Sequence, residues 1–272
     1  MSAGRLVVCP TPIGNLGDVT LRVLDALRSA DVVACEDTRH TRVLLDRHGV
    51  RAASLVSYHE HNESPRAAEL VARLRTGATV ALVSDAGMPS VSDPGFVLVR
   101  AALDARVRVE VLPGPSAVLV AVVASGLPAD RWRFVGFLPR KASDLPAVFA
   151  SVETVVAFES PRRLARSLAA LAAVDPARPV AVCRELTKVH EEVVRGDAAT
   201  VAAHFTQTDP RGEIVVVIGA AAAVDADFEP AVDALARLVE AGARTRPAAK
   251  VVAELTGTHA NALYEALQSR GG

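Results

Sequence analysis

The sequence over residues 82–95 is LVSDAGMPSVSDPG, and this stretch decides the fold of the first half of the chain. It begins at the end of an apolar run, residues 78–83, which predicts a β-strand. The loop that follows contains two carboxylates, two glycines and two prolines. Glycine lets a backbone approach a ligand closely, and α/β proteins bind ligands at the carboxyl ends of their strands. We therefore favour a ligand-binding loop over a purely structural turn for residues 84–95.

The first 115 residues alternate strand and helix patterns on either side of this stretch. Short apolar runs predict the strands, and longer amphipathic patterns predict the helices between them. This alternation favours a mostly parallel sheet with helices on both faces. The predicted strands are residues 5–9, 31–35, 53–57, 78–83 and 107–112, and the predicted helices are residues 20–29, 40–47, 64–75 and 95–104.

A second α/β domain is predicted over residues 116–222. It begins with an uncharged segment, residues 116–125, which is too short to cross a bilayer that needs about 20 residues, and which we interpret as a buried helix. Two consecutive strands without a helix between them then indicate a mixed sheet. The predicted strands are residues 131–137, 153–158, 179–184, 190–195 and 213–219, with a helix over residues 161–173.

The last segment, residues 223–272, is predicted to be a small helical domain behind an acidic linker at residues 225–230. Gly257 and Thr258 match a helix C-cap followed by an N-cap, which outlines a helix-turn-helix. Acidic residues outnumber basic ones in this segment, so nucleic-acid binding by the segment alone is not favoured. The predicted helices are residues 230–241, 246–256 and 259–269.

Composition narrows the functional classes. The chain has 272 residues, half of them hydrophobic, and a formal net charge of −1. This balance excludes a basic surface over the whole chain, so any contact with nucleic acid must come from a local patch. Cys9, Cys35 and Cys183 lie in separate apolar runs, which favours buried free thiols over disulfides or a zinc site. The chain enters a strand at once, without a leader pattern, and we expect a cytoplasmic protein with no membrane partner.

Polar loops follow the first three predicted strands at one edge of the first sheet. Residues 10–18 (PTPIGNLGD) occupy the place of a dinucleotide-binding loop but lack its G-x-G-x-x-G pattern, which disfavours an NAD-dependent oxidoreductase. Residues 36–41 (EDTRHT) and 57–63 (SYHEHNE) bring carboxylates, an arginine and histidines to the same edge. His59 and His61 lack further ligands at supporting spacing, so we expect no metal.

A local basic patch is predicted in the second domain. Its basic residues alternate with Trp132 and Phe134, a combination suited to phosphate contact and base stacking, although a solvated basic face has the same pattern. The basic residues are Arg131, Arg133, Arg140, Lys141, Arg162 and Arg163.

Taken together, the motifs resemble one family. Their order and spacing over residues 5–219 are similar to those of the small-subunit ribosomal RNA methyltransferases, a branch of the tetrapyrrole-methylase-like (class III) methyltransferases. The tail, with NALY at residues 261–264, resembles the C-terminal helical domain of that family. The motifs are PTPIGN (10–15), EDTRHT (36–41), HEHNE (59–63), SDAGMP (84–89), DPG (93–95), PGP (113–115), GFLP (136–139), ES (159–160) and RELTK (184–188).

The resemblance implies an α/β protein with two αβα domains of the tetrapyrrole methylase type, at residues 1–115 and 116–222, and a cofactor cleft between them. It implies S-adenosylmethionine as cofactor and methyl transfer to the 2′-hydroxyl of a cytidine in the decoding region of 16S rRNA, within the small ribosomal subunit, by a homodimer. The residues that it implies around the methionine and ribose are Asp85, Gly87, Met88, Ser116 and Ala117, those around the adenine are Phe158, Leu186 and Ile214, and those closing the cleft are Pro12 and Gly14.

The catalytic base is left open among several residues. A ribose hydroxyl is a poor nucleophile until it loses its proton, and a general base contributes typically about 10²–10⁴-fold. Lys188 would need a lowered pKa to act in this way. Arg39 is interpreted as an anchor for a phosphate or carboxylate. The candidates for the base are Glu36, Asp37, His59, Glu60, Glu185 and Lys188.

Two other functions are compatible with the same motifs. One is a class III methyltransferase that acts on a tetrapyrrole or another non-RNA substrate. The other is a binding protein in ribosome assembly that has the fold without methyl transfer. The basic patch and the helical tail favour the RNA substrate over the first, and the full set of polar loops favours an enzyme over the second.

Overall fold

The first sheet is fully parallel, with strand order β3-β2-β4-β1-β5. The structure, a computed structural model, describes residues 4–221, 228–256, 258 and 260–270. Parallel strands are buried on both faces and need apolar side chains at successive positions, which β2 (VVAC) and β4 (TVALV) have. The strands are β1 (Arg5–Val8), β2 (Val32–Cys35), β3 (Leu55–Ser57), β4 (Thr79–Val83) and β5 (Arg108–Val111).

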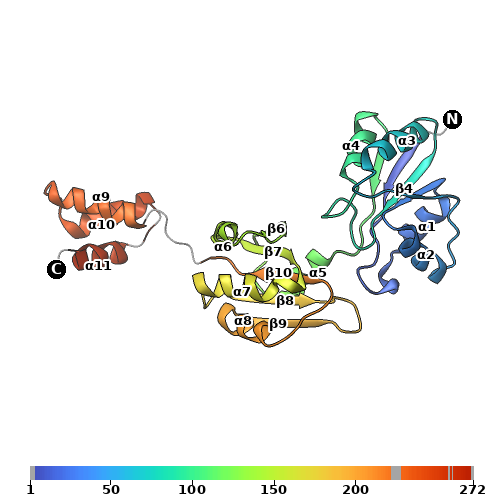
Figure 1. Cartoon of the computed structure of the whole chain (residues 1–272). Helices are drawn as coiled ribbons and strands as arrows, with labels where there is room; N and C mark the ends of the chain where they lie inside the picture. The colour runs from blue at the N-terminus through green and yellow to red at the C-terminus, as the bar shows by residue number, and fades with distance from the viewer. Residues whose placement is uncertain (1–3, 222–227, 257, 259, 271–272) are drawn as a thin grey trace. The chain divides into compact units, whose positions relative to one another are not determined.

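Helices cover both faces of this sheet, as predicted (Figure 1). Side chains of a strand alternate between the faces, so β1 contributes to two cores. Leu6 and Val8 belong to a buried cluster with residues of α3 and α4, whereas Val7 belongs to a second cluster with residues of α1 and α2. The helices are α1 (Leu21–Ser29), α2 (Thr38–Arg47), α3 (Glu63–Arg75) and α4 (Phe96–Asp104), and a short 3₁₀ helix, η1 (Leu16–Asp18), precedes α1.

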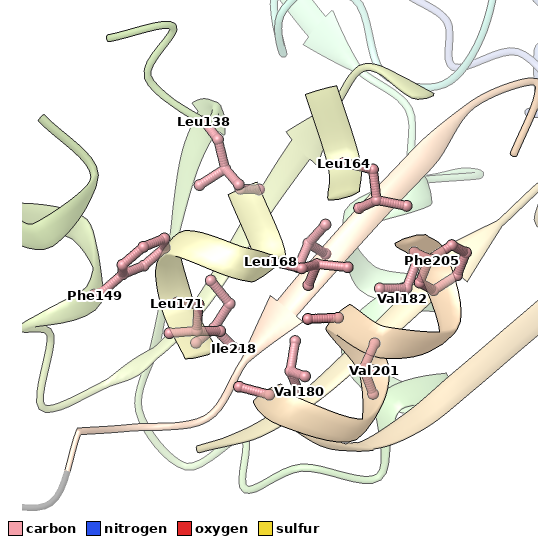
Figure 2. Packing of buried hydrophobic residues seen from close by; sticks show 14 of the residues in the cluster. Leu138, Phe149, Leu164, Leu168, Leu171, Val180, Val182, Val201, Phe205 and Ile218 are labelled. Atoms are coloured by element: carbon pink, nitrogen blue, oxygen red, sulfur yellow. The ribbon is translucent and has the colours of Figure 1, made fainter. Parts of the chain in front are cut away.

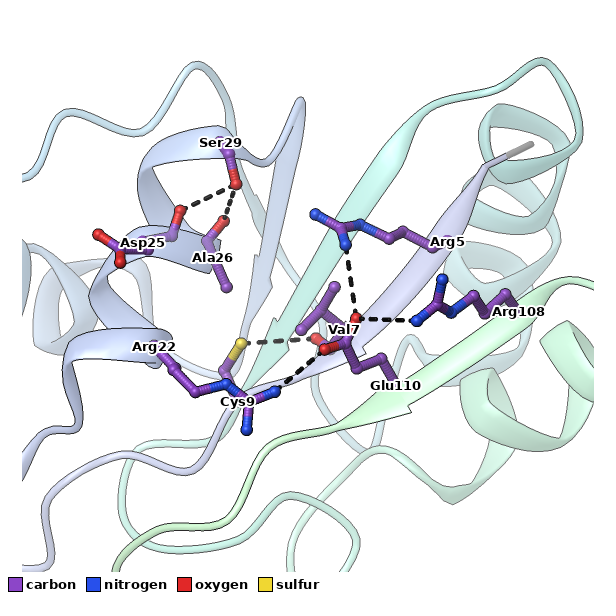
Figure 3. Close-up of polar contacts among 9 residues, drawn as sticks. All are labelled: Arg5, Val7, Cys9, Arg22, Asp25, Ala26, Ser29, Arg108 and Glu110. Atoms are coloured by element: carbon purple, nitrogen blue, oxygen red, sulfur yellow. Dashed lines mark hydrogen bonds and ion pairs between the residues drawn. The ribbon is translucent and has the colours of Figure 1, made fainter. Parts of the chain in front are cut away.

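The edge strand β5 is joined to β1 and α1 by charged side chains (Figure 3). The Glu110 carboxylate lies 3.4 Å from Arg5, 3.2 Å from Arg22 and 3.9 Å from Arg108. Cys9 is buried near Glu110. Burial, with a smaller contribution from Glu110, raises the pKa of its thiol to about 12. Cys9, Cys35 and Cys183 are all free and buried, which confirms the interpretation of the cysteines.

The second sheet is mixed, as predicted, with strand order β6-β7-β10-β8-β9. Strands β6 and β7 are parallel, and the other neighbouring pairs are antiparallel. The register of β6 shifts between Phe134 and Phe137, where Gly136 has a positive φ of 67°. The strands are β6 (Trp132–Phe137), β7 (Thr154–Glu159), β8 (Pro179–Arg184), β9 (Glu192–Asp197) and β10 (Ile214–Ile218).

One face of the second sheet packs against α7 and α8 (Figure 2). Leu168 of α7 and Phe205 of α8 share a buried cluster with Val180 and Ile218 of the strands. The sequence does not predict α6 or α8, because α6 is only five residues long and α8 is alanine-rich, with little contrast between its faces. The helices of this face are α6 (Leu145–Phe149), α7 (Pro161–Val174) and α8 (Ala198–Thr206), with the 3₁₀ helix η2 (Ala142–Asp144) before α6.

The opposite face packs against α5 (Ala117–Ser125), where the prediction of a buried helix is wrong for one side. Ala121 and Val122 are buried against the sheet, whereas Leu119 is 54% exposed and Val123 is 82% exposed. A helix that is apolar all round carries no signal for which side packs, so the sequence could not show this. No helix in the described ranges combines the length and apolar character needed to span a membrane.

The last helices form a separate compact unit. It consists of Ala150–Val152 and the described residues from Ala220 onward, while the two sheets and their helices form the other unit. Val232, Leu235, Val252 and Leu263 are buried in its core. The predicted boundary at residues 222/223, linker residues 225–227 and the cap at Gly257 lie outside the described residues. The helices of this unit are α9 (Phe228–Glu240), α10 (Thr245–Thr256) and α11 (Ala260–Arg270).

Candidate active site

A cavity of about 430 Å³ lies where strand ends of both sheets meet within the larger unit. The loop after β4, the first turn of α5, the ends of β6 and β7, the loop after β8 and the start of β10 all contribute to it. Its volume is within the range of about 300–1,000 Å³ typical of small-molecule sites. Its lining includes Ile13, Gly87, Met88, Ser92, Asp93, Ser116, Ala117, Phe137, Phe158, Glu159, Leu186, Glu213 and Ile214.

The loop after β4 is fixed to the loop after β1 by backbone hydrogen bonds. The Thr11 amide donates to the Gly87 carbonyl at 2.9 Å, and the Gly87 amide donates to the Thr11 carbonyl at 3.0 Å. The Thr11 hydroxyl also donates to the Ser84 carbonyl at 3.0 Å. Gly87 has a φ of 78°, which glycine adopts without strain. The first and fourth strands therefore present one rigid wall to the cavity.

Further along this loop the backbone is strained. Ser90 and Ser92 have φ values of 72° and 64°, in a region that residues with a side chain rarely adopt. Gly95 has a φ of 147°, and its amide donates to Glu63 of α3 at 2.8 Å. The loop is thus held by contacts on both sides, which is the usual condition for strain to persist at a functional site.

An apolar slot forms the other side of the cavity. Phe158 makes edge-to-face contacts with Phe134 and Phe137, with ring centroids 5.0 Å and 5.5 Å apart. Leu186 and Ile214 complete the slot. At its entrance α5 begins, and Ser116 caps that helix by accepting from the Leu119 amide at 3.5 Å. A planar apolar group fits the slot, and polar groups fit the first turn of the helix.

Glu159 is a lining carboxylate with a structural role. Its side chain is fully buried and lies 2.6 Å from Arg163, and it accepts from the Ser167 hydroxyl and the Ser160 amide, each at 2.6 Å. Arg163, which was predicted to contact RNA, donates to Glu159 and to the Leu138 carbonyl, and its side chain is 21% exposed.

The other basic residues of the predicted patch are exposed, and its aromatic residues are partly buried. Arg131, Arg133, Arg140, Lys141 and Arg162 have exposed side chains. Trp132 and Phe134 are partly buried and pack against the buried cluster beneath α5. The geometry leaves a basic surface suited to phosphates.

The predicted cofactor residues divide into two groups. Gly87, Met88, Ser116, Ala117, Phe158, Leu186 and Ile214 line the cavity, whereas Pro12, Gly14 and Asp85 do not. Asp85 lies outside the cavity lining. Its Oδ1 accepts from the Asp37 amide at 3.0 Å, and this hydrogen bond joins the loop after β4 to the loop after β2. Gly14 packs against the loop after β8, where an added methyl group would collide with Thr187 and Lys188.

The predicted bases on the first sheet lie outside the cavity lining. Asp37 caps α2 and pairs with Arg39 at 2.8 Å, and this partner holds the pKa of the Asp37 carboxyl down at about 2, which makes it a weak base. Burial raises the pKa of Glu36, whose carboxylate accepts from the Asp85 amide at 3.4 Å. Arg39 is itself committed to Asp37.

The remaining predicted bases are also occupied or exposed. His59 Nε2 contacts the Asn62 amide group at 3.3 Å, and its buried Nδ1 has no partner in the described part of the chain. Glu60 is exposed. Lys188 lies 2.8 Å from Glu185 and 2.9 Å from Glu213; partial burial alone would lower its pKa, but these hydrogen bonds outweigh burial and raise it. A lysine in this state does not accept a proton.

Asp93 is a lining residue that the sequence analysis did not single out. One signal was available, because residues 76–99 contain no lysine or arginine, so a carboxylate there has no neighbour in sequence to neutralise it. Among the described residues, no cluster of histidine, cysteine or carboxylate side chains has the arrangement of a metal site.

The fold and the cavity define the class of the protein. The family model of tetrapyrrole (corrin/porphyrin) methylases matches residues 5–202. The methyltransferase CobJ has a similar structure, with a TM-score of 0.61 and 21% identity over 81% of this chain and 95% of that chain. Uroporphyrin-III C-methyltransferase from Thermus thermophilus, complexed with S-adenosyl homocysteine, is also similar. Its TM-score is 0.56, with 23% identity over 79% of this chain and 97% of that chain. Both likenesses concern the fold.

Full-length relatives narrow the class. Proteins called ribosomal RNA small subunit methyltransferase I are similar to this chain, at 48% identity in Mesorhizobium japonicum over 96% of this chain and 90% of that protein. The corresponding protein of Escherichia coli O157:H7 is 40% identical over 99% of this chain and 97% of that protein. The chain belongs to this family of ribosomal RNA small subunit methyltransferases, within the tetrapyrrole methylases. The family and fold expected from the sequence are confirmed, and so is S-adenosylmethionine as the cofactor.

Proposed function

We propose that this chain transfers a methyl group from S-adenosylmethionine to the 2′-hydroxyl of a cytidine in the decoding region of 16S rRNA, within the small ribosomal subunit. The observation that carries the proposal is the cavity, whose apolar slot and helix terminus match an adenosine linked to an amino acid. The name shared by its relatives supports ribosomal RNA as the substrate.

The residues that would hold the cofactor are those of the predicted set that line the cavity. Phe158, Leu186 and Ile214 would bind the adenine, and Gly87, Met88 and Ser116 would face the ribose and methionine. The bound cofactor supplies an electrophilic methyl group on a sulfonium whose leaving group is neutral. The protein therefore has to position the hydroxyl in line with the methyl group and take up one proton.

The RNA would be held by the exposed basic residues of the predicted patch. Arg131 before β6, Arg133 within it, and Arg140, Lys141 and Arg162 supply positive charge on a chain with a formal net charge of −1. Such contacts to phosphates position a nucleic acid without reading its sequence. The choice of cytidine therefore depends on the cavity rather than on this surface.

We further propose that the enzyme acts in the cytoplasm as a homodimer. The exposed apolar side of α5, with Leu119 and Val123, supports an interface between two copies, because such residues are more stable when covered. Sedimentation of the purified protein tests this: a dimer is expected, and a monomer at micromolar concentration would contradict it.

The test of the reaction is transfer of labelled methyl groups to small ribosomal subunits that lack this modification, followed by mapping of the labelled nucleotide. We expect the label on the 2′-oxygen of one cytidine of 16S rRNA. Cofactor binding without label on the subunits would instead favour a tetrapyrrole or other non-RNA substrate. The absence of both would favour a non-catalytic binding protein.

A further inference from the structure

The cavity contains few groups that could accept a proton. Its titratable lining residues are Asp93, Glu159, Cys183 and Glu213. Glu159 is neutralised by Arg163, and burial raises the pKa of Cys183 to about 11. Glu213 is largely exposed and pairs with Lys188 at 2.9 Å. Asp93 is left as the lining carboxylate that no basic side chain pairs with among the described residues.

Asp93 is held in place by its loop. It stands between Ser92, which has a φ of 64°, and Pro94, whose ring fixes its own φ. The Ser90 amide donates to the Pro94 carbonyl at 3.3 Å and closes the loop around it. The Ser84 hydroxyl, just after β4, donates to the Ala86 and Gly87 carbonyls of the same loop at 3.4 Å and 3.5 Å. A group fixed in this way loses little freedom when it meets a substrate.

The charges around Asp93 make it a better base than an ordinary aspartate. Burial is the main effect, and Glu36 after β2, Asp85 after β4 and Glu213 before β10 add repulsion, whereas the Ser84 hydroxyl has the opposite effect on the pKa. Together they raise the pKa of Asp93 to about 7. A general base works best when its pKa lies near the working pH.

We propose that Asp93 is the general base that takes the proton from the substrate hydroxyl, an assignment that rests on the proposed methyl transfer. As the proton moves to the Asp93 carboxylate, the hydroxyl oxygen uses its electron pair to bond to the methyl carbon. The electrons of the breaking carbon–sulfur bond stay on sulfur, which becomes a neutral thioether. The positive charge of the sulfonium and the negative charge of the carboxylate are both cancelled, so the step balances.

The test compares Asp93→Asn with the wild-type protein in single-turnover methyl transfer to unmodified small subunits. We expect the rate at pH 8 to fall by about 10²–10⁴-fold, while the affinity for S-adenosylmethionine, measured by calorimetry, changes by less than about threefold. The variant should fold, because an amide relieves the repulsion from Glu36 and Asp85. The control is Asp104→Asn, which removes one exposed charge at the end of α4 and should leave both quantities unchanged.

The pH dependence supplies a second readout. A carboxylate base is active when ionised, so the wild-type rate should rise about tenfold per pH unit below about 7 and level off above it. Asp93→Asn should lose this step. Ser84→Ala removes the hydroxyl whose effect lowers the pKa of Asp93, so it should move the step to higher pH.

Several results would overturn the assignment. An active Asp93→Asn, or one that keeps the wild-type pH step, would show that another group takes the proton. A parallel loss of cofactor affinity and rate would make Asp93 a ligand of the cofactor's positive charge instead. A wild-type protein that binds the cofactor but methylates no subunit would overturn the proposed function, and this assignment with it.

Discussion

The loop after β4 (residues 84–95) and the loop after β8 (residues 185–191) have similar backbone conformations but differ in their charged side chains. Each follows an interior strand, and each contains two non-glycine residues with positive φ, Ser90 and Ser92 in the first and Glu185 and Thr187 in the second. The loop after β8 has its own cation, Lys188, within 2.8 Å of Glu185. The loop after β4 has none.

This difference in charge separates a loop whose carboxylate is neutralised from the loop that contains the proposed base. In the loop after β8, partial burial would raise the pKa of Glu185, but the hydrogen bonds from Lys188 and from the Glu213 amide lower it. In the loop after β4, repulsion between carboxylates acts together with burial, and the pKa of Asp93 rises. Strained backbone alone therefore does not identify the reactive residue, whereas strain together with an unneutralised carboxylate does.

The largest effect is expected from breaking the conformation of the loop after β4 with Gly95→Ala. The added methyl group would lie 2.5 Å from the Ser90 hydroxyl and 3.2 Å from the Ser90 amide, at a φ of 147°. We expect the free energy of unfolding to fall by about 1–3 kcal/mol and cofactor affinity to fall about tenfold or more, measured by denaturation and calorimetry.

Gly49→Ala is the matched control for this change. Gly49 also has a positive φ, 60°, but it has open space around it and lies after α2, away from the cavity. It should lose about 1–2 kcal/mol of stability with unchanged cofactor affinity. Equal affinities for the two variants would show that the conformation of residues 84–95 does not determine binding.

Lys188→Met should make the loop after β8 electrostatically similar to the loop after β4. The ion pair between Lys188 and Glu185 is partly buried. We therefore expect the free energy of unfolding to fall by about 1 kcal/mol at pH 7. A carboxylate with a lowered pKa stabilises the fold above its ordinary value of 4.5, and this contribution is lost as the pH falls through its pKa in the folded state. The difference between wild type and variant should therefore shrink in acid, as measured by urea unfolding across pH. Lys141→Met, at an exposed lysine, should show no such dependence.

A smaller effect is expected from Asp85, where charge and hydrogen bonding can be separated. Asp85→Asn keeps an oxygen that accepts from the Asp37 amide but removes one charge near Asp93, so the pH step of methyl transfer should move to lower pH with cofactor affinity unchanged. Asp85→Ala removes the tie between the two loops and should weaken cofactor binding several-fold without unfolding the chain. Identical behaviour of the two variants would show that the tie plays no part.

Much of the fold follows from local sequence patterns. The strands of both sheets, and the helices between the strands of the first, have periodic apolar patterns bounded by glycine, proline or capping residues. The sequence did not predict α8, whose alanine-rich turns pack through Val201 and Phe205. It also did not reveal which side of α5 is covered, because that depends on the sheet beneath it.

The candidate site also has a part that the sequence predicted and a part that only the structure shows. Seven predicted cofactor residues line the cavity, since strand ends meet at one edge in any sheet of this topology. The predicted bases were chosen by residue type and position, and the structure gives Asp37, Lys188 and Glu36 partners that occupy them. Arg163 was chosen for its charge, and the structure gives that charge to Glu159.

The sequence by itself determined the order of the strands and of most helices, the polar loops at the strand ends and the family to which the chain belongs. These features depend on residues that are close in the sequence or on motifs in a fixed order. Only the tertiary structure decided which carboxylate of the cavity lining, among the described residues, remains without a cation, because Glu36, Asp85, Glu213 and Lys188 come together from separate strand ends. The pKa of a group depends on charges a few ångströms away in space, and neither composition nor spacing records those distances.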